Sequence, residues 1–126
     1  MKTTKFFILA LTAIVIISCT TKKTETENAS ATTTEVSNGL VTSTFKIWGN
    51  CEMCKETIEG SLKVAGISKA DWNVDSKIMT VAYDSSKITL DQIQKNIAAV
   101  GYDTEKYKGD DQAYHELAEC CQYERK

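Results

Sequence analysis

Two pairs of closely spaced cysteines are the residues in this chain whose types and spacing could do chemistry. Cys51 and Cys54 form a CxxC pair, and Cys120 and Cys121 are adjacent. Thiolates with two residues between them can reach one ion, and such soft ligands select Cu(I), Zn²⁺ or softer ions over Mg²⁺ and Ca²⁺. Because Zn²⁺ usually takes four ligands and one CxxC supplies two, Cys51 and Cys54 favour Cu(I).

The expected surroundings of the CxxC pair favour thiolates. Apolar residues at helical spacing begin at Cys54 and predict a helix over residues 54–65. Free N–H groups and the helix dipole stabilise negative charge at a helix start, and Lys55 adds a positive neighbour. Both effects lower the pKa of a thiol.

The apolar pattern predicts six elements around this site. Alternating apolar residues indicate strands, and apolar residues at helical spacing indicate amphipathic helices. Thr89 and Gln92 have the spacing of a capping box, and Gly101 is expected to end the helix that they begin. In chain order we expect a strand at 41–47, a helix at 54–65, strands at 70–74 and 79–83, a helix at 90–100 and a strand at 102–107.

This order, βαββαβ, is the ferredoxin-like arrangement. We therefore predict an α+β fold in which a four-stranded antiparallel sheet carries two helices on one face. A short C-terminal helix capped by Asp110 and Asp111 follows, and we expect it to dock on the domain through one face. The residues that would share that face are Tyr114, Leu117, Ala118 and Cys121.

The first 18 residues have the pattern of a secretion signal. Lys2 and Lys5 precede an almost wholly apolar run that is shorter than the about 20 residues of a membrane span. The run ends in IISC, which resembles the bacterial lipobox, and this resemblance implies that Cys19 is lipidated. The alternative is a plain signal cut near Ser18, which would leave Cys19 as a free thiol.

Export and lipidation predict an organisation with a tether and a location in the bacterial cell envelope. The outer membrane is favoured over the inner one because Thr20, and not aspartate, follows the lipidated cysteine, and the domain is expected to face the periplasm. Polar residues dominate 20–38, and such a stretch buries too little to offset its ordering entropy. We expect a signal at 1–18, a lipidated cysteine and flexible tether at 19–39, a folded domain at 40–108 and a Cys-Cys extension at 109–126.

The composition argues against a nucleic-acid partner and against an enzyme. The formal net charge is −2, and it becomes −4 when the two lysines of the leader are removed. Such a chain lacks the basic footprint of a nucleic-acid-binding protein. There is no Ser/His/Asp pattern and no Gly-rich phosphate loop. The single histidine, His115, is expected to be solvent-exposed rather than a ligand beside Cys120.

Residues 41–107 resemble the heavy-metal-associated domain, a family that includes copper chaperones, N-terminal domains of copper-transporting ATPases and the periplasmic mercury-binding protein. The resemblance rests on GNCEMCKETIEGSL, AxWNVDxKxMTVAY and IAAVGYD. It implies that Cys51 and Cys54 bind the metal and that Tyr102 is the loop aromatic that shields it. It also implies an envelope partner, such as an efflux pump or a metal ATPase. The charged helix face expected to meet that partner comprises Lys55, Glu56, Glu59 and Lys63.

The metal loop departs from the family pattern. The family usually has a methionine and a small polar residue between the glycine and the first cysteine, whereas here only Asn50 follows Gly49. The loop is one residue shorter and the usual buried methionine is missing. These departures leave the identity of the preferred metal open, and they bear less on whether a metal binds. Met53 is expected to pack inward rather than to lend its thioether to a metal. Trp48 is expected to be a packing residue.

Three interpretations remain open for Cys120 and Cys121. Cys121 could simply pack in the interior. One or both thiolates could complete a three- or four-sulfur site, which would extend the choice of ion to Zn²⁺, Hg²⁺ or Cd²⁺. The pair could also be a redox partner of the CxxC pair.

The sequence therefore predicts a metal-binding module that carries or sequesters a soft ion, Cu(I), in the cell envelope. The alternatives are a thiol–disulfide redox protein and a Zn- or Hg-type binder that uses both cysteine pairs. The thioredoxin fold depends on a cis-proline beside its CxxC, and this chain contains no proline. That composition disfavours the redox enzyme.

Overall fold

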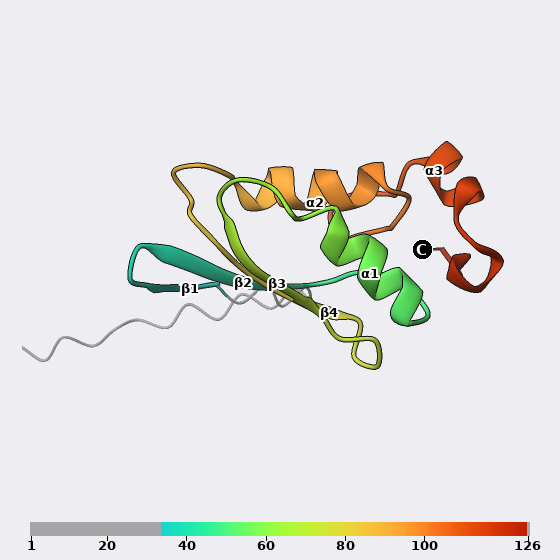
Figure 1. Ribbon diagram of the computed structural model, residues 1–126, viewed down its shortest axis with the longest axis horizontal. Helices are drawn as coiled ribbons and strands as arrows, with labels where there is room; N and C mark the ends of the chain where they lie inside the picture. The colour runs from blue at the N-terminus through green and yellow to red at the C-terminus, as the bar shows by residue number, and fades with distance from the viewer. Residues whose placement is uncertain (1–33, 126) are drawn as a thin grey trace, which may run out of the picture.

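The computed structural model describes residues 34–125, so the predicted signal, Cys19 and most of the predicted tether lie outside the described residues. The chain forms a four-stranded antiparallel sheet in the order β1-β2-β4-β3, with α1 and α2 on one face (Figure 1). The predicted α+β fold class is confirmed. The elements are β1 (Thr34–Ser37), β2 (Leu40–Lys46), α1 (Glu52–Gly60), β3 (Ile67–Trp72), β4 (Ile78–Tyr83), α2 (Leu90–Ala99), α3 (Asp111–Glu116) and a final 3₁₀ turn (Glu119–Cys121).

The first strand was not expected. Asn38 and Gly39 both have positive φ, 51° and 78°, and they join β1 to β2 in a two-residue hairpin. Asn-Gly is the preferred sequence for such turns because both central residues need the left-handed region. The predicted tether over 19–39 therefore does not extend across residues 34–39. All four residues of β1 are exposed, which is why this strand carries no apolar signal.

The strand predicted for residues 102–107 is reduced to one isolated bridge between Ile47 and Thr104. The chain cannot continue along β2 because it turns back at once. Thr104 N–H donates to the carbonyl of Tyr107 (2.8 Å), and Tyr107 N–H donates to the Thr104 hydroxyl (2.9 Å). The fourth strand of the sheet is thus β1, and not the segment after α2.

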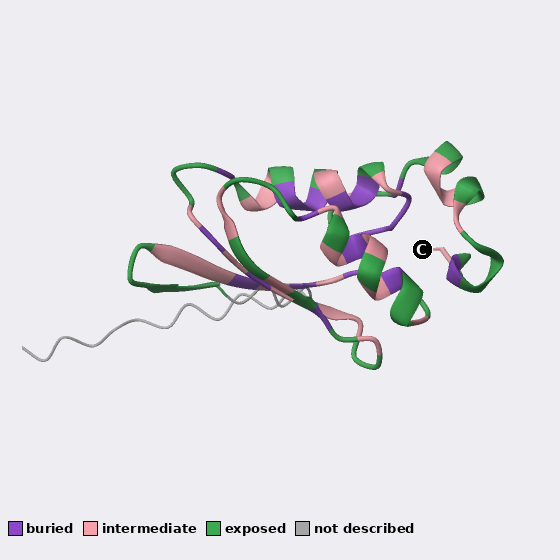
Figure 2. Ribbon diagram, in the orientation of Figure 1, coloured by how far each residue is buried: buried purple, intermediate pink, exposed green. Residues whose placement is uncertain are grey.

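The core lies between the sheet and the two helices (Figure 2). Alternate residues of β2 and β4, such as Phe45 and Met79, are at most 1% exposed, and they meet Ile58 of α1 and Ile93 of α2. Burial of each such side chain contributes about 1.5–3 kcal/mol. The predicted capping box is present at the start of α2, and Gly101 follows the helix with φ at 93°, as expected.

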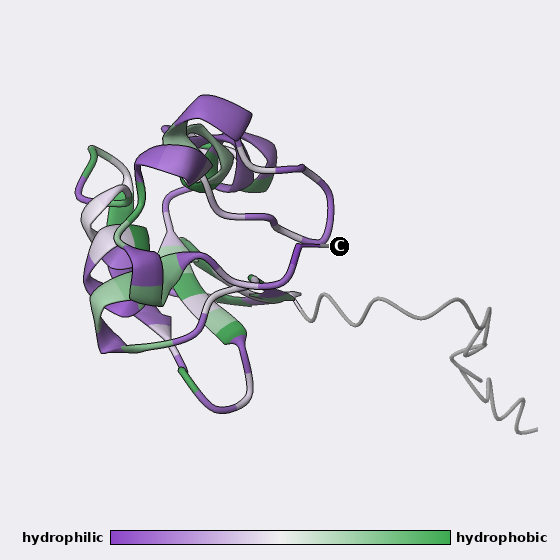
Figure 3. Ribbon diagram, turned by 90° about the vertical axis from the view of Figure 1, so that its right-hand side faces the viewer, coloured by the Kyte–Doolittle hydropathy of each residue, from purple (hydrophilic) through white to green (hydrophobic). Residues whose placement is uncertain are grey.

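The C-terminal segment, residues 110–125, docks on the domain as predicted, and Tyr114, Leu117 and Cys121 of the expected face pack against the core. The predicted cap of α3 is confirmed, because the Asp110 carboxylate accepts from the backbone N–H of Ala113. However, α3 ends at Glu116, no residue in it is buried, and Ala118 is exposed. The segment is mainly hydrophilic (Figure 3), and its two buried residues are Cys121 and Tyr123.

Polar contacts to one buried carboxylate hold this segment in place. Asp103 is fully buried; its Oδ1 accepts from the backbone N–H of Gly109 (2.7 Å) and from Nη2 of Arg125 (3.0 Å). The Tyr123 hydroxyl accepts from the Asp103 N–H (2.7 Å) and donates to the carbonyl of Gly101 (3.0 Å). Removal of one partner from a buried ion pair is strongly destabilising, so these contacts fix where the segment lies.

We expect Gly101→Ala to lower the free energy of unfolding by about 2–4 kcal/mol, through left-handed strain and overpacking. A Cβ at this position would lie 2.7 Å from the backbone N of Tyr114. Gly60→Ala is the matched control, since nothing lies within 4 Å of its added Cβ, and there we expect a gain of up to about 1 kcal/mol. Chemical denaturation measures both, and equal effects would contradict this account of Gly101.

Candidate metal centre

The CxxC pair lies at the start of α1, although the helix differs from the prediction at both ends. It runs from Glu52 to Gly60, with Cys51 as its N-cap in an extended conformation (φ −147°) and Cys54 in the first turn. Apolar spacing marked only the buried face. Because Glu52 and Met53 are exposed, they gave no sign that the helix begins before Cys54.

Three cysteine sulfurs gather where the start of α1 meets the C-terminal segment. The Sγ atom of Cys51 lies 3.5 Å from that of Cys54 and 3.8 Å from that of Cys121. All three sulfurs lie within 4.8 Å of one another, and within residues 34–125 they form the one such group of at least three candidate ligands. Cys54 and Cys121 are buried, whereas Cys51 is half-buried. The cluster is therefore open to solvent at Cys51.

The neighbouring thiol, Cys120, lies outside this cluster. It is exposed, and its sulfur is 4.0 Å from that of Cys121 and 3.9 Å from Sδ of Met53. The expectation that Met53 packs inward is wrong, because this residue is 51% exposed. His115 is exposed, as expected, and it contacts the ring of Tyr114 rather than the sulfurs.

The cysteines differ in their tendency to ionise. The pKa of Cys51 is lowered to about 7, mainly because the backbone N–H of Cys54 faces its sulfur and favours the thiolate. Burial and, to a smaller extent, the nearby thiol of Cys54 together raise the pKa of Cys121 to about 12. Cys51 thus carries a thiolate near neutral pH, while Cys121 keeps its proton in the metal-free protein.

Lys55 is not the positive neighbour of the thiols that the sequence suggested. Its Nζ donates to the carbonyl of Trp72 (2.7 Å) and pairs with Glu59 (2.5 Å), whose carboxylate also accepts from the Trp72 N–H (2.8 Å). These two side chains fasten α1 to β3. Of the charged face expected to meet a partner, Glu56 and Lys63 are exposed, whereas Lys55 and Glu59 are half-buried.

The ring of Trp72 packs beneath the metal loop at Gly49. Trp72 is fully buried, and a Cβ added at Gly49 would lie 2.9 Å from its Cη2 and 3.3 Å from Cβ of Cys54. The indole therefore occupies the space that a side chain at position 49 would need. The sequence placed Trp72 in the core but not beneath this loop, because the contact joins β3 to residues more than 20 positions earlier.

Tyr102 lies on the inner side of the sulfur cluster. It is fully buried, its ring stacks on that of Tyr123 at 5.8 Å, and its hydroxyl has no hydrogen-bond partner. Burial raises its pKa, and the nearby Cys54 and Cys121 raise it further. The C-terminal segment covers this tyrosine, so it is not an exposed loop aromatic. Its role in shielding an ion stays a prediction.

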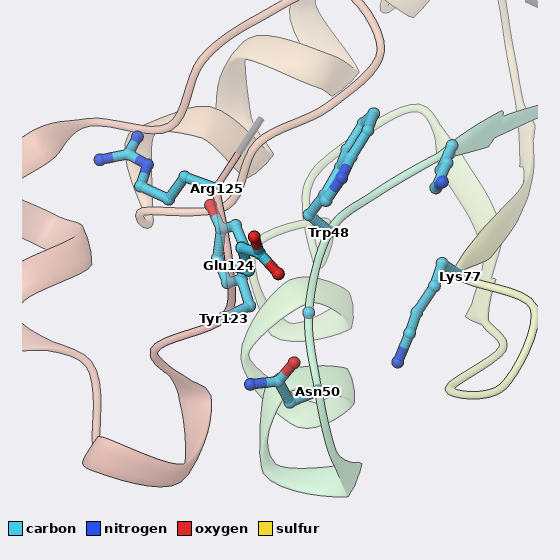
Figure 4. Close-up of a pocket in the computed structure, with 8 residues that line it drawn as sticks. Trp48, Asn50, Lys77, Tyr123, Glu124 and Arg125 are labelled. Carbon is cyan, nitrogen blue, oxygen red and sulfur yellow. The ribbon is translucent and has the colours of Figure 1, made fainter.

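An open pocket of about 360 Å³ adjoins the metal loop. Trp48 and Asn50 line one side and residues 123–125 line the other, with the guanidinium of Arg125 directed away from Lys77 (Figure 4). Trp48 is half-buried and packs under the ammonium group of Lys46, 4.8 Å from the ring centre, as its predicted packing role requires. The pocket leaves the loop accessible from this direction.

Comparison with known proteins identifies the family. The sequence profile of the heavy-metal-associated domain matches residues 45–103. The copper chaperone CopZ of Staphylococcus epidermidis is 36% identical over 55 residues, which are 43% of this chain and 81% of the chaperone. The chain belongs to the heavy-metal-associated domain family. Its sulfur cluster and this membership together establish a protein that binds soft metal ions.

Two further relatives of this heavy-metal-associated protein differ in their functions. A zinc-transporting ATPase of Synechocystis is 38% identical over 68 residues, which are 52% of this chain but only 9% of the ATPase. The solution structure of a Bacillus anthracis protein assigned copper-ion binding is 31% identical, has a TM-score of 0.51 and aligns over its whole length with 55% of this chain. The family match ends at residue 103, so Cys120 and Cys121 lie beyond it.

Sequence reasoning missed Tyr123 and Arg125, which hold the C-terminal segment in place. Cys121 and Tyr123 are buried and Arg125 is half-buried, while the residues between them are exposed. This period of two is typical of an extended segment packed on one side. The alternation at residues 121, 123 and 125 was the sequence signal for this packing, but the prediction extends a helical pattern as far as Cys121 instead.

We expect Cys51 to be alkylated by iodoacetamide at a rate that reaches half its maximum near pH 7, since the thiolate is the nucleophile and its pKa is lowered. Cys121 should stay unreactive up to strongly alkaline pH. Mass spectrometry of the reduced protein distinguishes the sites. Cys51→Ser should remove the alkylation that has its midpoint near pH 7 and leave that of the exposed Cys120, and a midpoint near the ordinary thiol value at Cys51 would contradict the N-cap effect.

Proposed function

We propose that this protein binds Cu(I) through Cys51 and Cys54 and carries or sequesters it in the bacterial cell envelope. The observation that carries the proposal is the pair of sulfurs 3.5 Å apart at the first turn of α1, one half-buried and one fully buried. Both donors are soft, and the CopZ relative is a copper chaperone.

Zn²⁺ is the main competitor, because one relative is a zinc-transporting ATPase. Structural zinc sites almost always have four ligands. Within residues 34–125, the cluster contains three cysteines and neither a histidine nor a carboxylate. A donor set of two or three sulfurs suits Cu(I), which accepts low coordination numbers, better than it suits Zn²⁺.

Transfer would proceed by ligand exchange, without an enzymatic step. An acceptor thiolate would approach at Cys51, the sulfur that solvent reaches, and would bind the ion while the bond to Cys51 breaks. Cys54 is fully buried and would release the ion last. A cysteine-bearing envelope protein, such as an efflux pump or a metal ATPase, is the expected partner.

A thiol–disulfide role is the second candidate, favoured by the same proximity of the sulfurs. Cys51 lies close enough to Cys54 and Cys121 for a disulfide to either to need little movement. Oxidation of Cys51 would remove a ligand, so in this reading a disulfide would switch metal binding off. Measurement of metal binding under reducing conditions distinguishes the two functions, because only the metal carrier requires tight binding by the reduced thiols.

We expect the reduced protein to compete for one Cu(I) with a chromophoric chelator and to lose at least 100-fold in affinity in Cys51→Ser/Cys54→Ser. The double variant removes both soft donors and leaves the core nearly unchanged in volume. Cys120→Ser, an exposed thiol outside the cluster, is the matched control and should bind normally. Tight Cu(I) binding by the double variant would refute the proposed site, and tighter Zn²⁺ than Cu(I) binding would refute the metal.

Location in the envelope rests on the leader and Cys19. No helix within residues 34–125 is long and apolar enough to span a membrane, and a lipid on Cys19 would supply an anchor. We expect the protein to fractionate with membranes and incorporate labelled palmitate, and Cys19→Ser to lose both properties. Cys120→Ser should retain them. Unlabelled protein, or membrane association that survives Cys19→Ser, would contradict lipidation.

A further inference from the structure

We propose that Cys121 is a third metal ligand, so that the C-terminal segment closes a three-thiolate site over the bound ion. This inference rests on the proposed binding of a soft ion by the CxxC pair. It assigns a ligand that lies beyond the part of the chain that matches the heavy-metal-associated family.

The spacing of the three sulfurs fits a trigonal ion. With metal–thiolate bonds of about 2.3 Å, an ion at the centre of a sulfur triangle needs edges of about 4.0 Å, whereas a linear two-sulfur ion needs a separation of about 4.6 Å. The edges at Cys51 are 3.5 Å to Cys54 and 3.8 Å to Cys121, and the third edge is within 4.8 Å. The triangle needs only small adjustments, while a linear site would force the CxxC pair apart.

The third sulfur is held in position before any ion arrives. Cys121 is 2% exposed, and its N–H donates to the carbonyl of Ala118 (2.7 Å) within the final 3₁₀ turn. Two residues later, the ring of Tyr123 stacks on Tyr102, and its hydroxyl accepts from the buried backbone N–H of Asp103. A ligand fixed in this way loses little conformational entropy on binding.

The adjacent cysteine cannot take the same role. Cys120 points its sulfur toward Met53 on the solvent face of α1, and it is outside the group of sulfurs that share one centre. The two neighbours in the CC pair therefore have different environments, and this makes Cys120 a control of identical chemistry one residue away.

Closure by Cys121 changes how the ion leaves. Binding forms three metal–sulfur bonds, and each thiol that binds gives its proton to solvent. An incoming acceptor thiolate meets an ion that already has three ligands, so a bond to Cys121 or Cys51 has to break as the new bond forms. Such a protein retains its cargo longer than a two-thiolate carrier does.

X-ray absorption spectroscopy of the reduced, Cu(I)-loaded protein tests the proposal directly, because it counts sulfur neighbours. We expect three sulfurs in the unmodified protein and in Cys120→Ser, and two in Cys121→Ser. Competition with a chelator should show a 10- to 100-fold weaker affinity for Cys121→Ser alone. Transfer of Cu(I) to a thiol acceptor should be faster from that variant.

Two sulfurs in the unmodified protein would overturn the proposal, whether or not Cys121→Ser folds. An unchanged sulfur count and affinity in a folded Cys121→Ser would overturn it as well, as would a loss of the third sulfur in Cys120→Ser. If any of these results is found while Cys51→Ser/Cys54→Ser still abolishes tight Cu(I) binding, only the third ligand is refuted and the proposed function remains. If Cys51→Ser/Cys54→Ser binds Cu(I) as tightly as the unmodified protein, the proposed function itself fails.

Discussion

A buried carboxylate that must have partners organises one end of this molecule. Asp103 is fully enclosed at the point where the chain leaves α2, and an isolated charge there would be very costly. The C-terminal segment supplies the cation, from Arg125, and its Tyr123 hydroxyl caps the adjoining backbone. The requirement to neutralise Asp103 thus brings in a segment that is otherwise mostly hydrophilic, and Cys121 comes with it. The ion pair between Asp103 and Arg125 thus places the sulfur of Cys121 beside those of Cys51 and Cys54.

The same packing gives the sulfurs unlike environments. Cys51 caps a helix at the surface, where backbone N–H groups favour its thiolate, whereas Cys121 lies in the interior and favours its proton. A cation is drawn first to the ionised and accessible sulfur. The neutral, enclosed sulfur avoids the repulsion that three thiolates would impose on the metal-free fold.

The sequence was sufficient for the parts of this fold that depend on local pattern. The alternation along β4, the capping box at Thr89 and the CxxC pair between a strand and a helix all arise from neighbours in the chain. The rest depends on contacts between distant segments. The fit of Trp72 beneath Gly49 and the different environments of Cys120 and Cys121 follow from packing that no local period encodes. The strand β1 was missed because its signal is the Asn-Gly turn rather than an apolar alternation.

The hairpin that opens the described chain bears on how the domain responds to tension. Everything before Thr34 connects to the domain through β1, an edge strand of four exposed residues held to β2 mainly by backbone hydrogen bonds. A force applied from the N-terminal side would detach β1 from the edge of the sheet before the force reached the hydrophobic core. The metal loop begins beyond the other end of β2, so that peeling would leave its geometry unchanged. Separation of β1 from the sheet would therefore release tension applied from the N-terminal side before that tension reached the metal site.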